Sequence, residues 1–155
     1  IREPFLSDVA DLARIHVQAW QETYPALLPA SEIAAYTLEL REKQWHHQIT
    51  ANASTIAYAP ATGFAQSGPQ RDAALLALGY THELYAIYLL DAAKGTGLGQ
   101  ALFAAVRPTA PFTALVLTGS HRAERFYITQ GATPLETRTD LIGETEIHET
   151  VMAWS

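Results

Sequence analysis

An apolar run that ends in alternating glycines is the feature that most constrains this chain. Residues 83–100 read ELYAIYLLDAAKGTGLGQ, so Gly95, Gly97 and Gly99 separate a strand-like segment from the helix-like QALFAAV. Glycines at such a junction let the backbone turn tightly and direct N–H groups outward. Because the N-terminus of the following helix adds a partial positive charge, the loop is suited to binding phosphate. The alternative is a helix start whose glycines serve packing alone.

Two familiar phosphate-binding loops do not fit this spacing. The chain contains no G-x-x-x-x-G-K-[ST] sequence, so the loop is not a Walker loop. The glycines lie past the middle of the chain, and no βαβ unit has an acidic residue about twenty positions further on. A dinucleotide-binding fold is therefore not expected.

Length and charge limit the classes of function that the chain can have. Its 155 residues fit one domain, residues 1–155, with no linker-like stretch. The net charge of −6 gives no general attraction for nucleic acid or for an anionic membrane, and it is compatible with a cationic amine as substrate. The absence of cysteine excludes disulfides and permits a reducing compartment. Because the sequence has no apolar run of ~18 residues and no signal-peptide layout, we expect a cytoplasmic protein.

Hydrophobic periodicity and turn residues predict a chain that alternates between helices and strands. Helices are expected at residues 7–24 with Ser7 as cap, from Ser31 to about Ile49, at about 97–106, and at 120–131. Strands are expected at residues 1–5, 54–60, 63–69, 81–90, 112–118, and on both sides of a turn at Gly143. The strand at 81–90 is almost continuously apolar, which predicts burial on both faces. Hairpins combined with one strand–helix–strand crossover indicate an α+β fold with a mixed sheet.

Three segments, at residues 1–29, 94–99 and 122–135, together resemble those of one family, the GNAT N-acetyltransferase superfamily. The segment Lys94–Gly99 lies on its motif A, Q/R-x-x-G-x-G/A, with a lysine that keeps the positive charge of arginine but lacks its planar fork. RAERFYITQGATPL is similar to the later A-x-x-F-Y-x-x-x-G-F segment, with Ala132 in place of the usual aromatic residue and Ser120 where asparagine is common. Residues 1–29 resemble the start of many bacterial members.

The resemblance implies a GNAT, or acyl-CoA N-acyltransferase, fold, with a splayed mixed sheet of about six to seven strands flanked by about four helices. It implies an enzyme that transfers an acetyl group from acetyl-CoA to a primary amine. The pantetheine arm of acetyl-CoA would pair with the backbone of residues 87–89, and the pyrophosphate would bind the glycine loop. The implied cofactor-binding residues are Ile87, Tyr88, Leu89, Lys94, Gly95, Thr96, Gly97, Leu98, Gly99, Gln100 and Ser120.

Two residues fall where the family places its catalytic groups. Glu83 begins the cofactor strand, where a glutamate acts as general base, often through water. The alternative is a charge in solvent or in an ion pair. His82 next to it should face the opposite side of the strand, and the sequence leaves open which of the two faces the acceptor. Tyr127 matches the tyrosine that protonates the departing thiolate, and the alternative is an aromatic residue packed in the core.

The acceptor is the least determined part of the prediction. The family forms one wall of the acceptor pocket at the positions of Trp20, Tyr24 and Leu28. The alternative role of these side chains is helix packing. The histidines show no metal-ligand spacing, so no metal is expected. The acceptor is expected to be a small-molecule or peptide amine, attacked directly in a ternary complex. Transfer of a longer acyl group, acylation of a protein N-terminus, and a non-catalytic acyl-CoA-binding module are the alternatives. The resemblance also allows a homodimer.

Overall fold

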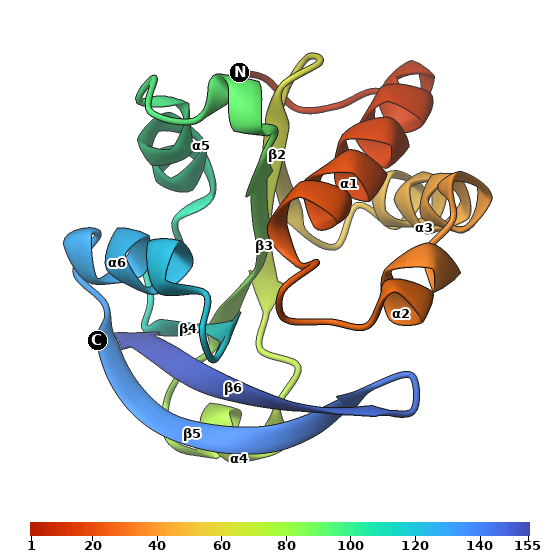
Figure 1. Cartoon of the computed structure of the whole chain (residues 1–155). Coiled ribbons are helices and arrows are strands. Elements are labelled where there is room, and N and C mark those ends of the chain that lie inside the picture. The colour runs from red at the N-terminus through yellow and green to blue at the C-terminus, as the bar shows by residue number, and fades with distance from the viewer.

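One six-stranded sheet runs through the structure, a computed structural model that describes residues 1–155 (Figure 1). The strands lie in the order β1-β2-β3-β4-β6-β5, with β3 and β4 parallel and every other neighbouring pair antiparallel. Their bounds are β1 Thr55–Ala59, β2 Gly63–Pro69, β3 His82–Leu89, β4 Phe112–Leu117, β5 Thr133–Ile142 and β6 Thr145–Trp154.

Helices cover both faces of this sheet. The helices α1 and α3 lie on one side of β1, β2 and β3, and α5 and α6 lie on the other side (Figure 1). None of the helices is both long and apolar enough to cross a membrane. Their bounds are α1 Val9–Thr23, α2 Ala30–Ala35, α3 Leu38–Ala51, α4 Ala73–Ala77, α5 Leu98–Val106 and α6 His121–Thr129. The predicted α+β fold with a mixed sheet and about four substantial helices is confirmed.

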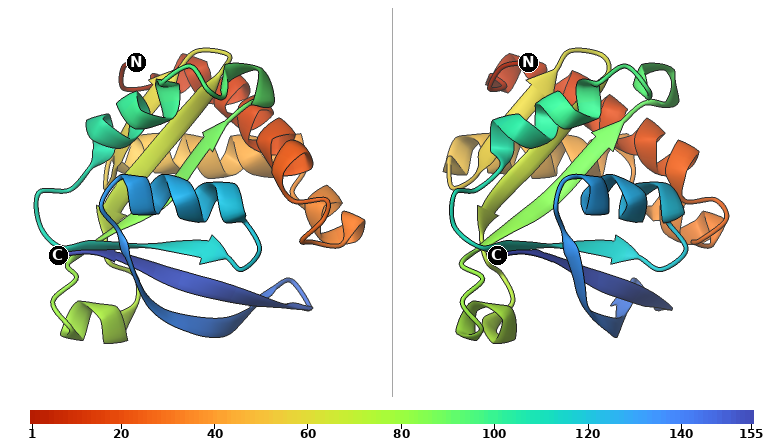
Figure 2. Two further views of the ribbon diagram at one scale, coloured as in Figure 1. Left: turned by 60° about the vertical axis from the view of Figure 1, so that its left-hand side comes forward. Right: turned by 90° about the vertical axis from the view of Figure 1, so that its left-hand side faces the viewer.

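The sheet opens between its two parallel strands. Residues 82–84 of β3 pair with residues 112–114 of β4, and beyond them the strands diverge (Figure 2). On the other side of β3, Gln66 of β2 pairs with Ala86, and the next residue, Ser67, pairs with Leu84. Tyr85 is therefore left without a partner and forms a bulge in β3. The expectation that this strand is buried on both faces is therefore wrong for its second half. Residues 85–89 are only half-buried, because the neighbouring strand has moved away.

The N-terminal third differs from its prediction in three places. The first residues form a single bridge, Arg2 with Tyr58, and not a strand. Ser7 lies inside a short 3-10 helix, Leu6–Asp8, and does not cap α1. The single helix expected from Ser31 is two helices. The side chain of Thr37 accepts a hydrogen bond from the backbone N–H of Leu40 and so starts a new helix.

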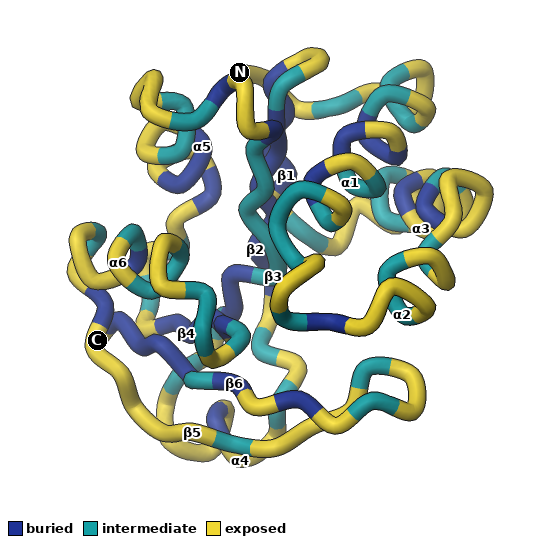
Figure 3. The backbone as a smooth tube through the Cα atoms, viewed as in Figure 1, coloured by how far each residue is buried: buried dark blue, intermediate teal, exposed yellow.

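Two hydrophobic clusters form the core, one on each face of the sheet (Figure 3). The larger lies between the sheet and α5 and α6, where the rings of Phe112 and Trp154 stack 4.4 Å apart. The smaller lies between β1–β3 and α1 and α3, and includes Trp45 and Phe64. Only the larger cluster contains residues from both halves of the opened sheet. It holds the two halves together on the side of α5 and α6.

Candidate functional site

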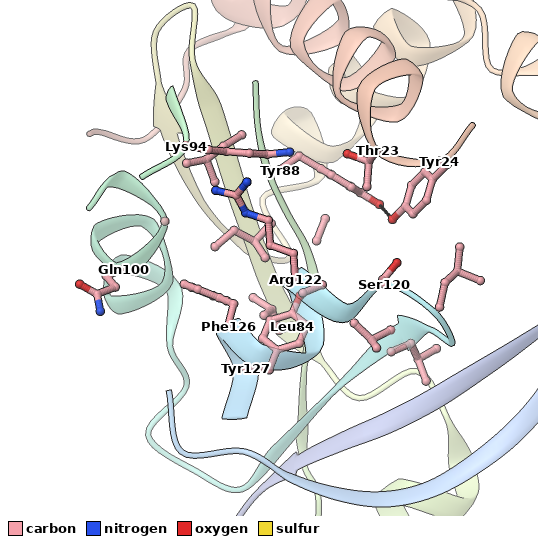
Figure 4. A pocket seen from close by; sticks show the side chains of 18 of the residues that line it. Thr23, Tyr24, Leu84, Tyr88, Lys94, Gln100, Ser120, Arg122, Phe126 and Tyr127 are labelled. Atoms are coloured by element: carbon pink, nitrogen blue, oxygen red, sulfur yellow. Dashed lines mark hydrogen bonds between the residues drawn. The ribbon is translucent and has the colours of Figure 1, made fainter. Parts of the chain in front are cut away.

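A cavity of about 430 Å³ lies where β3 and β4 separate. Its wall comes from both strands, the glycine loop, the first turn of α5, α6, and the end of α1 (Figure 4). The residues that line it are Thr23, Tyr24, Leu84, Tyr85, Ala86, Ile87, Tyr88, Leu89, Lys94, Gly95, Gly97, Gly99, Gln100, Leu115, Val116, Leu117, Ser120, Arg122, Ala123, Phe126 and Tyr127.

The glycine loop closes one end of this cavity. Its backbone is left-handed at Gly95, with φ of 78°, and at Gly97, with φ of 86°, conformations that other residues rarely adopt. Gly97 is the N-cap of α5, so the N–H groups of Gly99 and Gln100 lie in its first turn, where no intrahelical acceptor exists. A helix start with free donors beside a cavity can bind an anion.

Two cations stand at the same end. Lys94 belongs to the loop, and its Nζ lies 2.6 Å from Oδ1 of Asp91. Arg122 comes from the first turn of α6, and Figure 4 shows both side chains on the same side of the cavity. Arg122 was not predicted from the sequence. The one local feature of the sequence that could have indicated it is a cationic residue two positions after Ser120, the N-cap of α6.

Four tyrosines line the cavity, and three of them, Tyr24, Tyr88 and Tyr127, lie close to one another. The hydroxyls of Tyr24, at the end of α1, and Tyr88, on β3, lie 2.8 Å apart and share a hydrogen bond. Tyr127 enters from α6 and is 6 % exposed. Burial, followed by the nearby Tyr88 hydroxyl, raises the pKa of Tyr127 well above its ordinary value. The Tyr127 hydroxyl therefore holds its proton more firmly than an exposed tyrosine does, and it can donate a hydrogen bond.

Most of the residues expected to bind the cofactor line the cavity, and two of them do not. Thr96 turns back on the loop, where its hydroxyl donates to the carbonyl of Ala93 at 2.6 Å and accepts from the N–H of Leu98 at 3.4 Å. Leu98 packs against the larger hydrophobic cluster. The cavity-lining members of the expected set are Ile87, Tyr88, Leu89, Lys94, Gly95, Gly97, Gly99, Gln100 and Ser120.

Glu83 does not line the cavity. Its buried carboxylate accepts hydrogen bonds from Arg71, with Nε 3.1 Å from Oε1 and Nη2 2.6 Å from Oε2. Arg71 also lies over the ring of Tyr85, with the guanidinium carbon 4.0 Å from its centroid. His82 is also outside the cavity and bonds the hydroxyl of Thr81. The geometry is that of an ion pair, and the role of Glu83 as a general base stays a prediction.

Of the three residues expected in the acceptor wall, Tyr24 alone lines the cavity. Trp20 packs edge-on against Tyr24, with ring centroids 5.1 Å apart, and Leu28 is buried. No group of three or more His, Asp or Glu side chains is arranged to hold a metal ion.

The fold is that of the acyl-CoA N-acyltransferase class, and known proteins share it. A GCN5-related N-acetyltransferase from Rhodopseudomonas palustris superposes with a TM-score of 0.73 at 16 % identity, covering 99 % of this chain and 93 % of that one. The yncA protein of Salmonella typhimurium, solved with its cofactor acetyl-CoA, superposes with a TM-score of 0.69 at 17 % identity, covering 99 % and 91 %.

The sequence also has a relative in this class. The uncharacterized N-acetyltransferase YuaI of Bacillus subtilis is 33 % identical over 106 residues, which are 67 % of this chain and 60 % of that protein. The match thus spans about three fifths of the relative's length. No family model matches the chain. On its fold and this relative, the chain belongs to the GNAT superfamily.

The Arg71–Glu83 pair gives a prediction for stability. Replacing Arg71 with methionine leaves the buried Glu83 carboxylate without its charged donors, and should lower the free energy of unfolding by about 1–3 kcal/mol. Adding Glu83→Gln should recover part of this loss, because the unpaired charge is removed. Urea unfolding of both variants measures the effect.

Lys43→Met is the matched control for this prediction, since Lys43 forms an ion pair with Glu39 in which both side chains are at least 74 % exposed. An exposed pair of this kind contributes about 0–1 kcal/mol. If Arg71→Met costs no more than Lys43→Met, the pair does not hold the buried carboxylate.

Proposed function

We propose that this protein transfers an acetyl group from acetyl-CoA to a primary amine. The observation that carries the proposal is the cavity between β3 and β4, which is lined by a helix start with free N–H groups and by the buried Tyr127. This arrangement matches the two ends of an acyl-CoA: a pyrophosphate and a thioester at opposite ends of an extended arm.

The backbone of β3 supports binding of that arm. Beyond Leu84 the strand has no partner on the side of β4, so the peptide groups of residues 87–89 on this side are free to pair with the amides of pantetheine. The N–H groups at the start of α5, together with Lys94 and Arg122, would hold the pyrophosphate. The bulge at Tyr85 changes the direction of β3 where it leaves β4.

The chemistry is direct attack in a ternary complex. The neutral amine nitrogen attacks the acetyl carbon, the new C–N bond forms, and the C–S bond breaks with its electron pair on sulfur. A backbone N–H near Leu89 would stabilise the developing oxyanion, and the Tyr127 hydroxyl would protonate the thiolate. The amine must lose a proton, and Glu83 is the sequence-based candidate for its acceptor. Because its carboxylate lies outside the cavity, this transfer would run through water.

An assay of thiol release with acetyl-CoA and a panel of primary amines tests the proposal. Direct attack predicts intersecting initial-velocity lines when both substrates are varied. Parallel lines together with an isolable acetylated enzyme would contradict direct attack. Tight acetyl-CoA binding by calorimetry without turnover on any amine would instead favour the non-catalytic acyl-CoA-binding module.

The glycine loop gives a prediction with a matched control. Gly97 and Gly79 both have positive φ, 86° and 99°, and at neither would an added Cβ meet an atom within 4 Å. Substitution by aspartate therefore introduces similar backbone strain at both positions. Gly97→Asp should abolish acetyl-CoA binding, because its carboxylate would repel the pyrophosphate, whereas Gly79→Asp should bind as the wild type does. Equal affinities in calorimetry would show that the phosphate site lies elsewhere.

Tyr127→Phe tests the proton donor. The ring keeps its packing and the hydroxyl is lost, so kcat should fall by about 10²-fold, at the low end of general acid catalysis. The acetyl-CoA affinity should not change. Tyr58→Phe is the control, because it removes a buried hydroxyl that bonds Asp11 outside the cavity. A Tyr127→Phe enzyme as active as Tyr58→Phe would exclude this hydroxyl as the acid.

A further inference from the structure

Glu149 is a buried carboxyl group on β6, and one of its two oxygens has no hydrogen-bond donor. It is 7 % exposed, and its Oε1 is shielded from solvent without a hydrogen-bond partner. Buried polar atoms are almost always paired, and an unpaired one is costly. Glu83, a buried carboxylate on the same sheet, is paired in the ordinary way, because Arg71 donates hydrogen bonds to both of its oxygens. A buried acceptor oxygen without a donor is therefore a position where a ligand can supply one.

Glu149 does not itself line the cavity, but the strand register places it next to a residue that does. On β6, Met152 and Trp154 belong to the core on the side of α5 and α6, so Glu149 points to the opposite face of the sheet. Its direct cross-strand partner on β4 is Leu117, which lines the cavity. Side chains of directly paired residues lie about 5 Å apart at Cβ. Leu115, on the same face, is 37 % exposed, so this face is open next to the cavity.

The charges around Glu149 favour a cation. Its other cross-strand partner is Arg138 on β5, but that guanidinium donates to Asp72 at 2.6 Å and to Glu136 at 2.5 Å. Burial raises the pKa of Glu149, and Asp140 on β5 raises it further through its charge and through a hydrogen bond between the two carboxyl groups. Glu83 adds to this effect, and Arg138 opposes it.

Negative charge is therefore in excess on this face. This face has five carboxyl groups but only two guanidinium groups near them, those of Arg71 and Arg138. An ammonium ion would supply the hydrogen-bond donors that Oε1 lacks, and would also reduce the excess of negative charge. An amine that carries its own carboxylate would add to that excess. The five carboxyl groups are those of Asp72, Glu83, Glu136, Asp140 and Glu149.

We propose that Glu149 binds an ammonium group of the acceptor other than the amine that is acetylated, and that the acceptor is an amine without a carboxylate. The proposal rests on the acetyl transfer proposed above and deepens it by naming the substrate class. The ammonium would bind beside Leu117, at the side of the cavity away from the glycine loop. Glu149 is in this role an acceptor-binding residue.

Two amines of equal chain length test the substrate class. Both 1,4-diaminobutane and 4-aminobutanoate present a primary amine on a four-carbon chain, and they differ in the group at the other end. We expect kcat/KM for the wild-type protein to be about 10- to 100-fold higher with the diamine, the effect of one charged hydrogen-bonded contact. Equal values, or preference for 4-aminobutanoate, would overturn the proposal.

Glu149→Gln tests the residue. It should lower kcat/KM for 1,4-diaminobutane by about 10- to 100-fold, mainly through a higher KM, and should reduce the preference over 4-aminobutanoate. Its affinity for acetyl-CoA should not change. Glu146→Gln is the matched control, because Glu146 lies on the same strand with its side chain 67 % exposed, and it should behave as the wild type does.

The outcomes separate this proposal from the proposed function. If no amine in the panel releases thiol from acetyl-CoA, the acetyl transfer itself is refuted, and the acceptor proposal with it. If amines are acetylated but Glu149→Gln matches Glu146→Gln in KM, only the role of Glu149 is refuted. The comparison of the two amines uses the wild-type protein, so it decides the substrate class even if Glu149→Gln does not fold.

Discussion

The structure depends on the shortness of the pairing between β3 and β4. Hydrogen bonding in a sheet normally continues until one strand ends, but here two parallel strands pair over residues 82–84 and 112–114 and then part. This separation creates the cavity and leaves one edge of β3 without a protein partner. It also brings the start of α5 and the side chains of α6 to a common space. The larger hydrophobic cluster compensates for the separation of the strands, because it joins both halves of the sheet on one face.

The parts of the site that lie close together in the chain were predictable from the sequence. The glycine loop and the first turn of α5 form one continuous segment, and local backbone chemistry determines their shape. Tyr127 was found through its segment, RAERFYITQG, which resembles a known motif. The α+β fold followed in the same way from periodicity and turn residues. The order and pairing of the strands, by contrast, come from the structure.

Residues whose role depends on tertiary pairing were not predictable in this way. Nothing in the sequence relates Glu149 to Leu117 or Arg71 to Glu83, because strand register and loop path bring them together. The break between α2 and α3 was missed for a different reason. The residues at the break, Tyr36 and Thr37, include neither proline nor glycine. The chain leaves helical geometry at Tyr36, and the Thr37 side chain then caps the start of α3.

The two edges of the sheet also differ in how they are protected from pairing with another chain. At β1, Arg2 exchanges both backbone hydrogen bonds with Tyr58 and covers part of that edge. At β5, the outer strand is ten residues long and mostly exposed, and charged side chains stand at positions 136, 138 and 140. A long exposed edge of this kind invites intermolecular strand addition, and regularly spaced charges oppose it. Glu136 and Asp140, two of the carboxyl groups around Glu149, therefore also oppose the addition of another strand at this edge.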